Sequence, residues 1–592
     1  MKILLSGNEA IALGAYHAGV KVATAYPGTP STEILEAVAR FPDVYAEWST
    51  NEKVAMEVAM GAAYAGARAL CSMKQVGLNV ASDPFMAASV TGIQAGLVVA
   101  NADDPGIHSS QCEQDNRFYA PFAKVPMLEP SDSQEAYDLM AYAFDISEKF
   151  DTPVLVRTTT RIAHAKSAVN VSGKRPSPGQ ASFQHDMGKY VMLPTNARVR
   201  CRVVEERSRR LAEYVESFPL NEVVWGKHRL GIVTSGVAYQ YAREVFPGAS
   251  FLKLCMTWPL PANLIQKFAD KVAKLIVIEE LSPYLEGRIR EMGIEVSGKD
   301  FIPALGELNP AIIEQAAHKA GLLPKSFPVT PVRLPTDLPK RPPVLCPGCP
   351  HSGVFFVLSM LGQRTKGKNP KITVTGDIGC YTLGAYPPLN ALDTTACMGA
   401  SIGQAIGMAK AGVGEKVVAV IGDSTFMHSG ITGLVNAVYD KANIALLILD
   451  NGTTAMTGHQ EHPGTGVTVR GEKTQPVELE KLVRGIGVKD VRVVDAFDLK
   501  ALRTNLRESL QSPELSVLIV RGPCAVQAER QTPEAVDAAL CNDCDTCLLV
   551  GCPAILGGDG QVKIDETLCI GCTVCQQLCP RRAIAPESRK AA

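Results

Sequence analysis

The stretch Lys416-Val-Val-Ala-Val-Ile-Gly-Asp-Ser424 decides the fold of the chain. Its first six residues are a continuous apolar run, as expected for a strand that is buried on both faces of a parallel sheet. A helix-length segment follows, and a second apolar run, residues 444–449, then leads into Asp450-Asn-Gly-Thr453. Because a strand–helix–strand crossover is right-handed, Asp423 and Asn451 are expected at the carboxyl ends of two parallel strands. The pattern predicts an α/β domain with a doubly wound parallel sheet.

These two strand ends carry the oxygen ligands of a predicted metal site. Open α/β sheets bind ligands at the carboxyl edge of their strands, and carboxylate and amide oxygens suit Mg²⁺, which shares phosphate oxygens. Gly422 would let the backbone approach a diphosphate, and the helix that follows Ser424 would present its N-terminus to it. The alternative is that Asp423 and Asn451 are ordinary turn residues, because both residue types favour turns.

Composition places the chain among ordinary globular proteins. Its 592 residues have a mass of 63.2 kDa, which suggests about three to five domains. Hydrophobic residues make up 46% of the chain and charged residues 20%, so disorder is not expected. The 59 Lys and Arg residues nearly balance the 60 Asp and Glu residues, so nothing favours nucleic acid or an anionic membrane as a partner.

The location predicted from the sequence is the cytoplasm. The longest apolar runs fall far short of the ~20 residues that a membrane-spanning helix needs, and Glu9 interrupts the N-terminus before the core of a signal peptide can develop. Thiols stay reduced in that compartment. The 17 cysteines are therefore expected to be metal ligands or catalytic groups rather than disulfides.

Alternating strand and helix patterns divide the chain into several α/β parts. In the first part we predict strands at residues 22–26, 96–100 and 154–158. In a polar linker that follows, Arg198, Arg200 and Arg202 alternate as on the exposed face of a strand; the alternative is an anion-binding site. The predicted segments are an α/β domain at 1–165, a linker at 166–205, an α/β domain at 206–324, a proline-rich linker at 325–343, an α/β domain at 344–537 and a cysteine-dense domain at 538–592.

Eight cysteines lie in the last predicted domain and read Cys541-x2-Cys544-x2-Cys547-x4-Cys552-Pro and Cys569-x2-Cys572-x2-Cys575-x3-Cys579-Pro. The pattern resembles the bacterial two-cluster ferredoxin, with one extra residue in the first run. In that fold the fourth cysteine of each run ligates the other cluster. The alternative is a pair of zinc sites, since CxxC repeats also bind zinc. The resemblance implies two [4Fe–4S] clusters, one on Cys541, Cys544, Cys547 and Cys579 and the other on Cys569, Cys572, Cys575 and Cys552.

Three further motifs resemble the 2-oxoacid:ferredoxin oxidoreductases, a thiamine-diphosphate-dependent family. They are Ala25-Tyr-Pro-Gly-Thr-Pro-Ser31, Cys346-Pro-Gly-Cys-Pro-His351 and Asp450-Asn-Gly-Thr-Thr-Ala-Met-Thr-Gly-His-Gln460. The resemblance covers essentially the whole chain. It implies that residues 1–165 form a pyrimidine-binding domain, residues 206–324 a transketolase C-terminal-like domain and residues 344–537 the diphosphate-binding domain.

The same resemblance assigns cofactor-binding roles. Gly-Asp-Ser followed by Asn451 resembles the thiamine-diphosphate motif, which implies that Asp423, Asn451 and the carbonyl of Thr453 hold Mg²⁺ on the cofactor diphosphate. Glu52 falls where the family carries the glutamate that activates the aminopyrimidine ring; the alternative is a capping box formed by Ser49 and Glu52. The other residues implied to bind the cofactor are His351, Gly379, Gly399, Ala400, Ser401, Gly422 and Ser424.

A second group of cysteines gains meaning from the family. Cys346 and Cys349 form a CxxC motif, which alone could be a redox pair, half of a metal site or a coincidence. Relatives hold a proximal [4Fe–4S] cluster beside the thiamine with such a motif and two later cysteines. The resemblance therefore implies a third cluster with the ligands Cys346, Cys349, Cys380 and Cys524.

Thr29 and Arg117 are the residues that the resemblance offers for the substrate carboxylate. For Arg117 a surface ion pair is an equally good explanation. The chain departs from the family pattern at Gly28, where relatives often have Ile, and at His459, where many have Gly. A smaller residue at position 28 is expected to admit a larger side chain on the substrate, which is consistent with an aryl group.

The activity that the resemblance implies is oxidative decarboxylation of aryl 2-oxoacids, indolepyruvate among them. The products would be an aryl-acetyl-CoA and CO₂, with electrons passed to ferredoxin. The implied partners are a smaller beta subunit, ferredoxin and CoA, in a heterodimer of dimers. Three alternatives stay open: the same chemistry on another 2-oxoacid, a non-oxidative thiamine decarboxylase with an accessory ferredoxin domain, and a non-catalytic electron-transfer adaptor.

Overall fold

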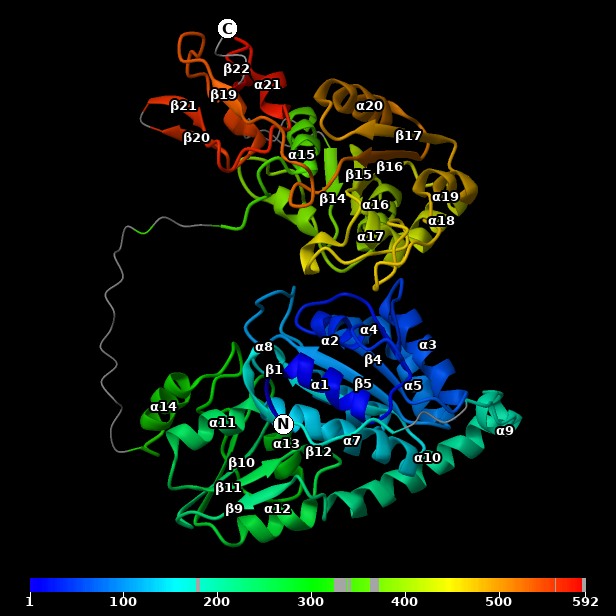
Figure 1. The fold of residues 1–592 in the computed structure, drawn as a ribbon, viewed down its shortest axis with the longest axis vertical. Coiled ribbons are helices and arrows are strands. Elements are labelled where there is room, and N and C mark those ends of the chain that lie inside the picture. Colours follow the sequence, from blue (N-terminus) through cyan, green and yellow to red (C-terminus); the bar gives the residue numbers. More distant parts are fainter. Residues whose placement is uncertain (177–180, 324–337, 339–341, 363–371, 559, 588–592) are drawn as a thin grey trace. The chain divides into compact units, whose positions relative to one another are not determined.

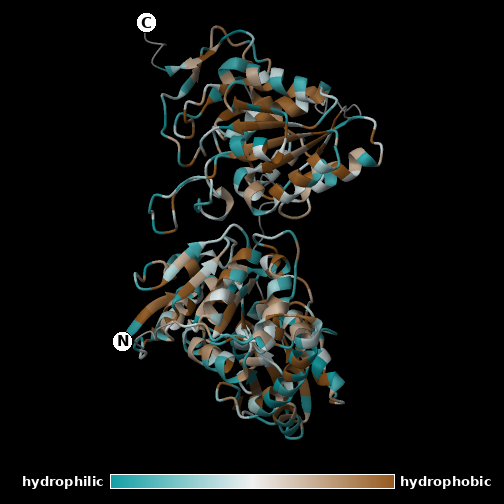
Figure 2. Ribbon diagram, turned by 90° about the vertical axis from the view of Figure 1, so that its right-hand side faces the viewer, coloured by the Kyte–Doolittle hydropathy of each residue, from teal (hydrophilic) through white to brown (hydrophobic). Residues whose placement is uncertain are grey.

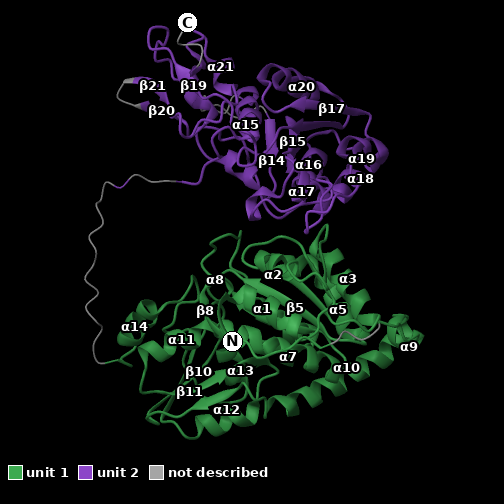
Figure 3. Ribbon diagram, in the orientation of Figure 1, with its two compact units in different colours: residues 1–333 green, residues 334–592 purple. Residues whose placement is uncertain are grey.

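The computed structural model describes residues 1–592 except 177–180, 324–337, 339–341, 363–371, 559 and 588–592. The chain forms two compact units, Met1–Arg333 and Leu334–Ala592 (Figures 1 and 3). The predicted proline-rich linker at 325–343 lies largely outside the described residues. Among the described helices, none is long and apolar enough to cross a membrane.

Unit 1 contains a seven-stranded sheet that is parallel except for β12, which pairs antiparallel with β6 at one edge. The strands predicted at residues 22–26, 96–100 and 154–158 are confirmed as β2, β5 and β7. In sheet order the strands are β12 (Met256–Trp258), β6 (Met127–Leu128), β7 (Val154–Thr159), β5 (Leu97–Asp103), β4 (Ala69–Lys74), β2 (Val22–Ala25) and β3 (Tyr45–Trp48). A separate antiparallel pair is formed by β1 (Lys2–Ser6) and β8 (Lys166–Asn170).

Helices connect the strands of this sheet, as the alternating pattern predicts (Figure 1). Helix α1 packs against α7, and α3 packs against α5. The helices are α1 (Gly7–His17), α2 (Thr32–Val38), α3 (Glu52–Tyr64), α4 (Gln75–Val80), α5 (Ser82–Thr91), α6 (Tyr119–Ala123), α7 (Ser133–Phe150) and α8 (Thr160–His164). Parallel strands followed by helices direct the loops after β2, β4 and β5 to one edge of the sheet, where ligands bind in such folds.

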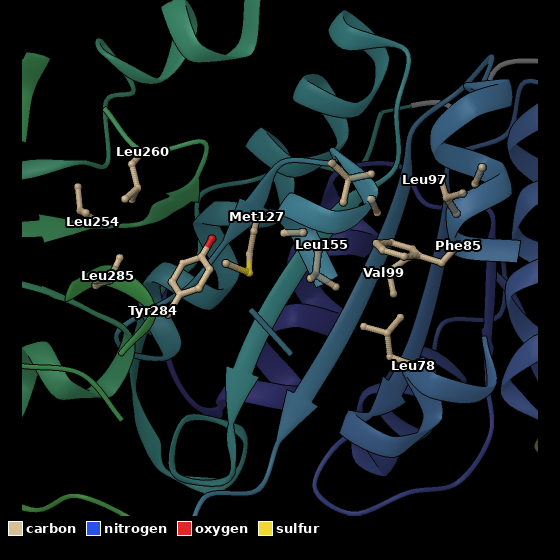
Figure 4. Close-up of a cluster of buried hydrophobic side chains, with 14 of the residues drawn as sticks. Leu78, Phe85, Leu97, Val99, Met127, Leu155, Leu254, Leu260, Tyr284 and Leu285 are labelled. Atoms are coloured by element: carbon tan, nitrogen blue, oxygen red, sulfur yellow. The ribbon is translucent and has the colours of Figure 1, made fainter. Parts of the chain in front are cut away.

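A four-stranded sheet follows in the same unit, in the order β13 (Lys274–Ile278), β10 (Leu230–Ser235), β11 (Ser250–Leu254) and β9 (Glu222–Val224). Its helices are α11 (Gly236–Val245), α12 (Ala262–Ala269), α13 (Tyr284–Glu291) and α14 (Pro310–Lys319). One hydrophobic core joins the two parts of unit 1. Phe85 and Val99 from the first part and Tyr284 and Leu285 from the second belong to the same buried cluster (Figure 4).

The segment predicted as an irregular linker, residues 166–205, contains more structure than expected. Besides β8 it holds the short helix α9 (Met187–Tyr190) and the start of the long helix α10 (Pro194–Val215). The alternating strand predicted for its arginines is wrong, because Arg200, Val204, Arg207 and Leu211 recur at helical spacing and are buried. Arg200 is ion-paired with Asp151 at 2.6 Å, so part of the buried face of this helix is charged rather than apolar.

Unit 2 is built on a five-stranded sheet in which all strands run parallel. The predicted crossover is confirmed, since β15 and β16 are neighbours and Gly422 pairs with Leu449 in register. In sheet order the strands are β14 (Ile372–Thr375), β15 (Lys416–Gly422), β16 (Ile444–Asp450), β18 (Ser516–Arg521) and β17 (Asp490–Asp495). The helices are α15 (Pro350–Leu361), α16 (Ala400–Lys410), α17 (Asp423–Thr425), α18 (Ile431–Tyr439), α19 (Leu479–Ile486) and α20 (Leu499–Gln511), with a π-helical turn, Phe426–Gly430, between α17 and α18.

The cysteine-dense tail packs directly on this sheet domain. Val550, Ile555 and Cys575 belong to the same buried cluster as Leu447 and Val520 of the central strands. Figure 2 shows that the central strands of the unit are its most hydrophobic part. The tail elements are β19 (Glu534–Val536) paired with β22 (Ile584–Pro586), β20 (Ile555–Gly558) paired with β21 (Gly560–Ile564), and the helix α21 (Val574–Leu578).

Arg117 is the centre of a buried ionic contact within unit 1. Only 1% of its surface is exposed. Its guanidinium pairs with Asp115 at 2.7 Å and with Glu279 at 2.6 Å, and it donates hydrogen bonds to the carbonyls of Glu280 and Ser282 at 2.7 and 3.0 Å. The loop after β5 is thereby fixed to the end of β13 in the second part of the unit.

Removing this guanidinium leaves two buried carboxylates without their partner. We therefore expect Arg117→Met to lower the free energy of unfolding of unit 1 by about 3–5 kcal/mol. Urea denaturation followed by tryptophan fluorescence measures this directly, because all three tryptophans (Trp48, Trp225 and Trp258) lie in unit 1. Arg161→Met, which breaks an exposed pair with Glu307, should cost less than about 1 kcal/mol; equal effects of the two changes would contradict the structural role of Arg117.

Candidate active site

Asp423 joins the two strand-end loops at the carboxyl edge of the unit 2 sheet. It is 3% exposed and lies directly after β15. Its Oδ1 accepts the N–H of Ser424 at 2.8 Å, and its Oδ2 accepts the N–H of Gly452, in the loop after β16, at 2.9 Å. In that loop Asn451 Oδ1 accepts the N–H of Thr453 at 3.2 Å. The structure therefore brings the predicted metal ligands Asp423, Asn451 and Thr453 together at one edge.

The groups around Asp423 fit a divalent cation. Asp450 pairs with Arg521 at 2.7 Å, yet burial, with a further contribution from the Asp423 carboxylate, raises the pKa of Asp450. His462 Nδ1 accepts the N–H of Gly464 at 3.1 Å. The Nε2 of the same ring lies 3.3 Å from Asp423 Oδ2 and makes no hydrogen bond within the described residues. Two close carboxylates and an amide oxygen form a hard donor set of the kind that Mg²⁺ shares with a diphosphate.

Two glycines of this edge make room for the ring of Tyr381. A Cβ on Gly422 would lie 2.5 Å from the Tyr381 ring, and a Cβ on Gly379 would overlap the same ring. The Tyr381 hydroxyl donates a hydrogen bond to the carbonyl of Ile378 at 2.8 Å, and it lies within hydrogen-bond distance, 3.0 Å, of the Thr425 hydroxyl. The expected approach of a diphosphate to Gly422 stays a prediction; the structure adds that this glycine accommodates the packed Tyr381 ring.

The start of α16 is held by a side chain of the same sheet edge. Asp377 accepts the N–H groups of Gly399 and Ser401 at 2.8 and 3.0 Å, and Ala400 donates to the carbonyl of Cys397 at 3.1 Å. The cofactor-binding role of Gly399, Ala400 and Ser401 stays a prediction. Their amides already have partners within the chain.

His351 lies in the first turn of α15 and is 3% exposed. Its ring is edge-on to Tyr381, with 6.0 Å between ring centroids. Burial lowers the pKa of His351 to about 4, against an opposing effect of the Asp423 carboxylate. The imidazole is therefore neutral near physiological pH and can donate one hydrogen bond and accept another beside the predicted cofactor site.

The second cysteine group is assembled at the same edge. The N–H of Cys524 donates to the carbonyl of Asn451 at 3.3 Å, which anchors this cysteine directly beside a predicted metal ligand. Burial first, and then the neighbouring Cys346 and Cys524, raise the pKa of Cys380 to about 11. Burial raises the pKa of Cys349 too, with contributions from the other three thiols. Binding of iron would favour the deprotonated form of these cysteines, because thiols bind iron as thiolates.

The tail cysteines line two cavities, and each cavity takes three cysteines from one run and one from the other. One cavity is lined by apolar side chains and by Cys552, Cys569, Cys572 and Cys575. The other is lined by Cys541, Cys544, Cys547 and Cys579. These are the two ligand sets that the ferredoxin resemblance implies. Among the described residues, no three His, Cys, Asp or Glu side chains surround the position of one single ion, whereas a cubane takes each thiolate on a different iron.

The CxxC turn touches the first of these cavities. Gly348 and Cys349 form part of its lining, and the N–H of Gly348 donates to the Cys552 sulfur. Gly348 has φ +70°, and a Cβ there would overlap Ile570. The cysteine set at the sheet edge and one tail set are therefore in direct contact.

Glu52 lies in unit 1, as the first residue of α3, and is 4% exposed. The capping-box alternative is wrong. Asn51 is the cap, because its Oδ1 accepts the N–H of Val54 at 2.9 Å, while Ser49 donates to Glu47 at 2.7 Å. A Cβ on Gly77 would lie 2.7 Å from Glu52 Oε1, so the glycine makes room for this carboxylate.

The predicted substrate residues have different surroundings. Thr29 is partly exposed on the loop after β2, close to the carboxyl edge of the first sheet. The guanidinium of Arg117 is fully occupied by protein partners, which favours a structural role over substrate binding. The space over Gly28, expected to admit a larger substrate, is taken by the stem of Lys74, whose Cγ would lie 3.0 Å from a Cβ at that position. Sequence reasoning missed Lys74, although a lysine that ends the buried run of β4 was a signal.

Comparison with protein families supports two cofactors. The family described as "Pyruvate flavodoxin/ferredoxin oxidoreductase, thiamine diP-bdg" matches residues 13–192. "Thiamine pyrophosphate enzyme, C-terminal TPP binding domain" matches residues 377–520, and "4Fe-4S binding domain" matches residues 562–585. Fold, site and matches together define a multidomain α/β oxidoreductase chain with thiamine-diphosphate-binding domains and a ferredoxin-type iron–sulfur domain.

Full-length relatives identify the particular family. The indolepyruvate oxidoreductase subunit IorA of Archaeoglobus fulgidus is 42% identical, over 99% of this chain and 97% of the relative. That of Methanothermobacter thermautotrophicus is 40% identical, over 99% and 98%. The chain belongs to the family of indolepyruvate oxidoreductase subunit IorA. A solved 2-oxoglutarate:ferredoxin oxidoreductase from Magnetococcus marinus covers 54% of this chain and 65% of its own, with 19% identity and a TM-score of 0.44, too low to carry an argument.

The ligand set at the sheet edge predicts the effect of Asp423→Asn. We expect weaker retention of Mg²⁺ and thiamine diphosphate, by about tenfold to a hundredfold in dissociation constant, because a predicted charged ligand of the cation is lost. The readout is cofactor content, measured as thiochrome fluorescence after gel filtration in buffers of fixed Mg²⁺ concentration. Asp440→Asn, in the turn after α18, is the control. Iron content should be unchanged in both variants; wild-type cofactor retention in Asp423→Asn would show that Asp423 does not hold the metal.

Proposed function

We propose that this chain is the alpha subunit of an enzyme that oxidatively decarboxylates aryl 2-oxoacids, indolepyruvate among them. The overall change is R–CO–COO⁻ plus CoA–SH to R–CO–S–CoA plus CO₂ and one proton, with two electrons passed singly to two ferredoxins. The observation that supports this most is the contact between Cys524 and Asn451. It joins a predicted cofactor site to a cysteine set suited to electron transfer. Full-length similarity to the indolepyruvate oxidoreductase subunits gives the substrate class.

The chain's own residues then have distinct tasks. Asp423, Asn451 and the Thr453 carbonyl would hold Mg²⁺ on the diphosphate, and Glu52 would hold a proton at the aminopyrimidine ring. Thiamine diphosphate, when bound, supplies a thiazolium carbanion for attack on the 2-oxo carbon and a sink for the electrons released with CO₂. The neutral, buried His351 would donate a hydrogen bond beside the diphosphate without adding a charge. Tyr381 packs against Gly379 and Gly422 at this edge.

The cysteine sets form a series that begins at the cofactor edge, and we include three [4Fe–4S] clusters in the proposal. The first set (Cys346, Cys349, Cys380 and Cys524) is anchored beside Asn451. The second (Cys552, Cys569, Cys572 and Cys575) contacts the first through Gly348. The third (Cys541, Cys544, Cys547 and Cys579) lies in the tail and is the proposed exit toward ferredoxin. Clusters held there would supply one-electron carriers, which a two-electron oxidation needs when its acceptor takes one electron at a time.

A partner subunit belongs to the proposal. The relatives are named as one subunit of an oxidoreductase, and a smaller beta subunit in a heterodimer of dimers, in the cytoplasm, fits that description. A non-oxidative decarboxylase with an accessory ferredoxin domain is the second candidate. The first cysteine set argues against this candidate, because a decarboxylation without oxidation releases no electrons for a cluster beside the cofactor to accept.

The test of the activity is a substrate panel. The chain is purified anaerobically with its partner subunit and supplied with indolepyruvate, phenylpyruvate, pyruvate or 2-oxoglutarate, together with CoA and ferredoxin. We expect CoA-dependent ferredoxin reduction with the two aryl substrates and at least tenfold lower kcat/KM with the two small ones. Release of CO₂ and aldehyde with no ferredoxin reduction would support the non-oxidative alternative instead.

The proximal cluster is tested by Cys380→Ala. Three cubanes amount to about twelve iron atoms per chain, so this variant should hold about eight. Substrate-dependent ferredoxin reduction should collapse while CO₂ release continues. Cys397→Ala is the matched control, because Cys397 is an exposed cysteine outside the three sets. Full iron content with full ferredoxin reduction in Cys380→Ala would show that the first cysteine set holds no cluster.

A further inference from the structure

Lys74 occupies a position that the functional assignments so far leave unused. It is the last residue of β4, at the carboxyl edge of the unit 1 sheet. Its stem lies across Gly28, on the loop that carries Thr29. Its charge interacts with Glu52 and with Asp104. Lys74 therefore packs against the predicted substrate loop, and its charge acts on the predicted cofactor-activating carboxylate.

The ammonium group of Lys74 has bonding capacity to spare. Within the described residues its Nζ donates one hydrogen bond, to the carbonyl of Ser109 at 2.7 Å, and forms no ion pair. An ammonium carries three N–H groups, so two directions remain for a ligand. Arg117, by contrast, spends its donors on Asp115, Glu279 and backbone carbonyls.

The nearby carboxylate of Asp104 does not neutralise this cation by direct contact. Its Oδ2 accepts hydrogen bonds from the Ser109 N–H and the Ser110 hydroxyl, both at 2.7 Å, and its Oδ1 accepts one from Thr160 at 2.8 Å. These bonds shape the loop after β5 and leave Lys74 Nζ turned toward Ser109. Burial lowers the pKa of Lys74, and an anion bound beside the ammonium would offset this desolvation.

We propose that Lys74 binds the carboxylate of the 2-oxoacid substrate, with Thr29 beside it. This assignment rests on the proposed function and names a residue of that same site. The carboxylate of a 2-oxoacid is bonded to the carbon that reacts, so it must bind close to the group that activates the cofactor. The charge of Lys74 interacts with Glu52, and within the described residues its ammonium forms no ion pair.

Gly28 holds the lysine in place by having no side chain. A Cβ there would lie 3.0 Å from Lys74 Cγ and 3.1 Å from Cδ, tighter than ordinary van der Waals contact. The glycine does not have a positive φ, so Ala is compatible with its backbone conformation. Gly28→Ala should therefore act only by displacing the Lys74 stem, and the two residues work as a pair.

The experiment uses the complete enzyme with phenylpyruvate as the probe. For Lys74→Met, which keeps most of the stem but not the charge, we expect KM for phenylpyruvate to rise by about tenfold to a hundredfold, the range of a lost charge-assisted hydrogen bond. The change in kcat should be smaller, and KM for CoA and for ferredoxin should not change. Lys74→Arg should restore part of the affinity. Lys53→Met is the control, because Lys53 is an exposed lysine on α3, paired with Glu57.

A double-mutant cycle keeps the test decisive. Gly28→Ala alone should raise KM for phenylpyruvate, but it should add little once Lys74 is already Met. An unchanged KM for phenylpyruvate in Lys74→Met would overturn the proposal. Lys74 would then have only a structural role, its hydrogen bond to the Ser109 carbonyl. A rise confined to KM for CoA would also overturn it, by assigning the cation to a CoA phosphate. The two proposals can fail separately. If the wild-type enzyme reduces ferredoxin with arylpyruvates and Lys74→Met has the same KM, this inference is wrong and the proposed function is unaffected.

Discussion

The hydrogen bond from the Cys524 N–H to the Asn451 carbonyl is the contact on which the account of this protein depends. It exists because β16 and β18 are parallel neighbours in register, so that the residues after Asp450 and after Arg521 leave the sheet side by side. Asn451 belongs to the predicted metal site and Cys524 to the first cysteine set. A shift of one residue in this register would turn side chains to the opposite face and separate the two sites.

The other predicted sites of unit 2 are positioned by packing against the sheet. The CxxC turn lies against the first cysteine-lined cavity of the tail. The tail shares a hydrophobic core with the strands that carry Asp423 and Asn451. The distances between the proposed redox sites are thereby set by a shared buried core. Unit 1 is organised differently, since a buried charged contact around Arg117 fixes the loop after β5 to its second sheet.

Local patterns in the sequence predicted much of this structure. The apolar runs that became β15 and β16, and the residues that end them, were identified because strand period and crossover handedness are local rules. Grouping of the tail cysteines followed from spacing and from the ferredoxin resemblance. Helix α10 was missed because its buried face contains Arg200 and Arg207, so its helical period was hidden in a polar composition. The contacts of Lys74 with Gly28 and Ser109 join distant segments, and no local pattern encodes them.

Gly422 and Gly28 also have packing partners that the sequence did not reveal. Gly422 was expected directly after a strand and is the last residue of β15. A side chain there would also meet Tyr381, which lies far from it in sequence. Gly28 was interpreted as open space, whereas the fold fills that space with a lysine stem. Residue identity at such positions indicates close packing, but only the structure shows which partner comes close.

The central claim is that the thiamine site and the first cysteine set act as one redox unit, and freeze-quench EPR of the anaerobic enzyme tests it most directly. Enzyme with its partner subunit is mixed with phenylpyruvate in the absence of ferredoxin and sampled within the first turnover. The account predicts a reduced iron–sulfur signal that forms as fast as CO₂ is released. Release of CO₂ while every cluster stays oxidised would contradict it.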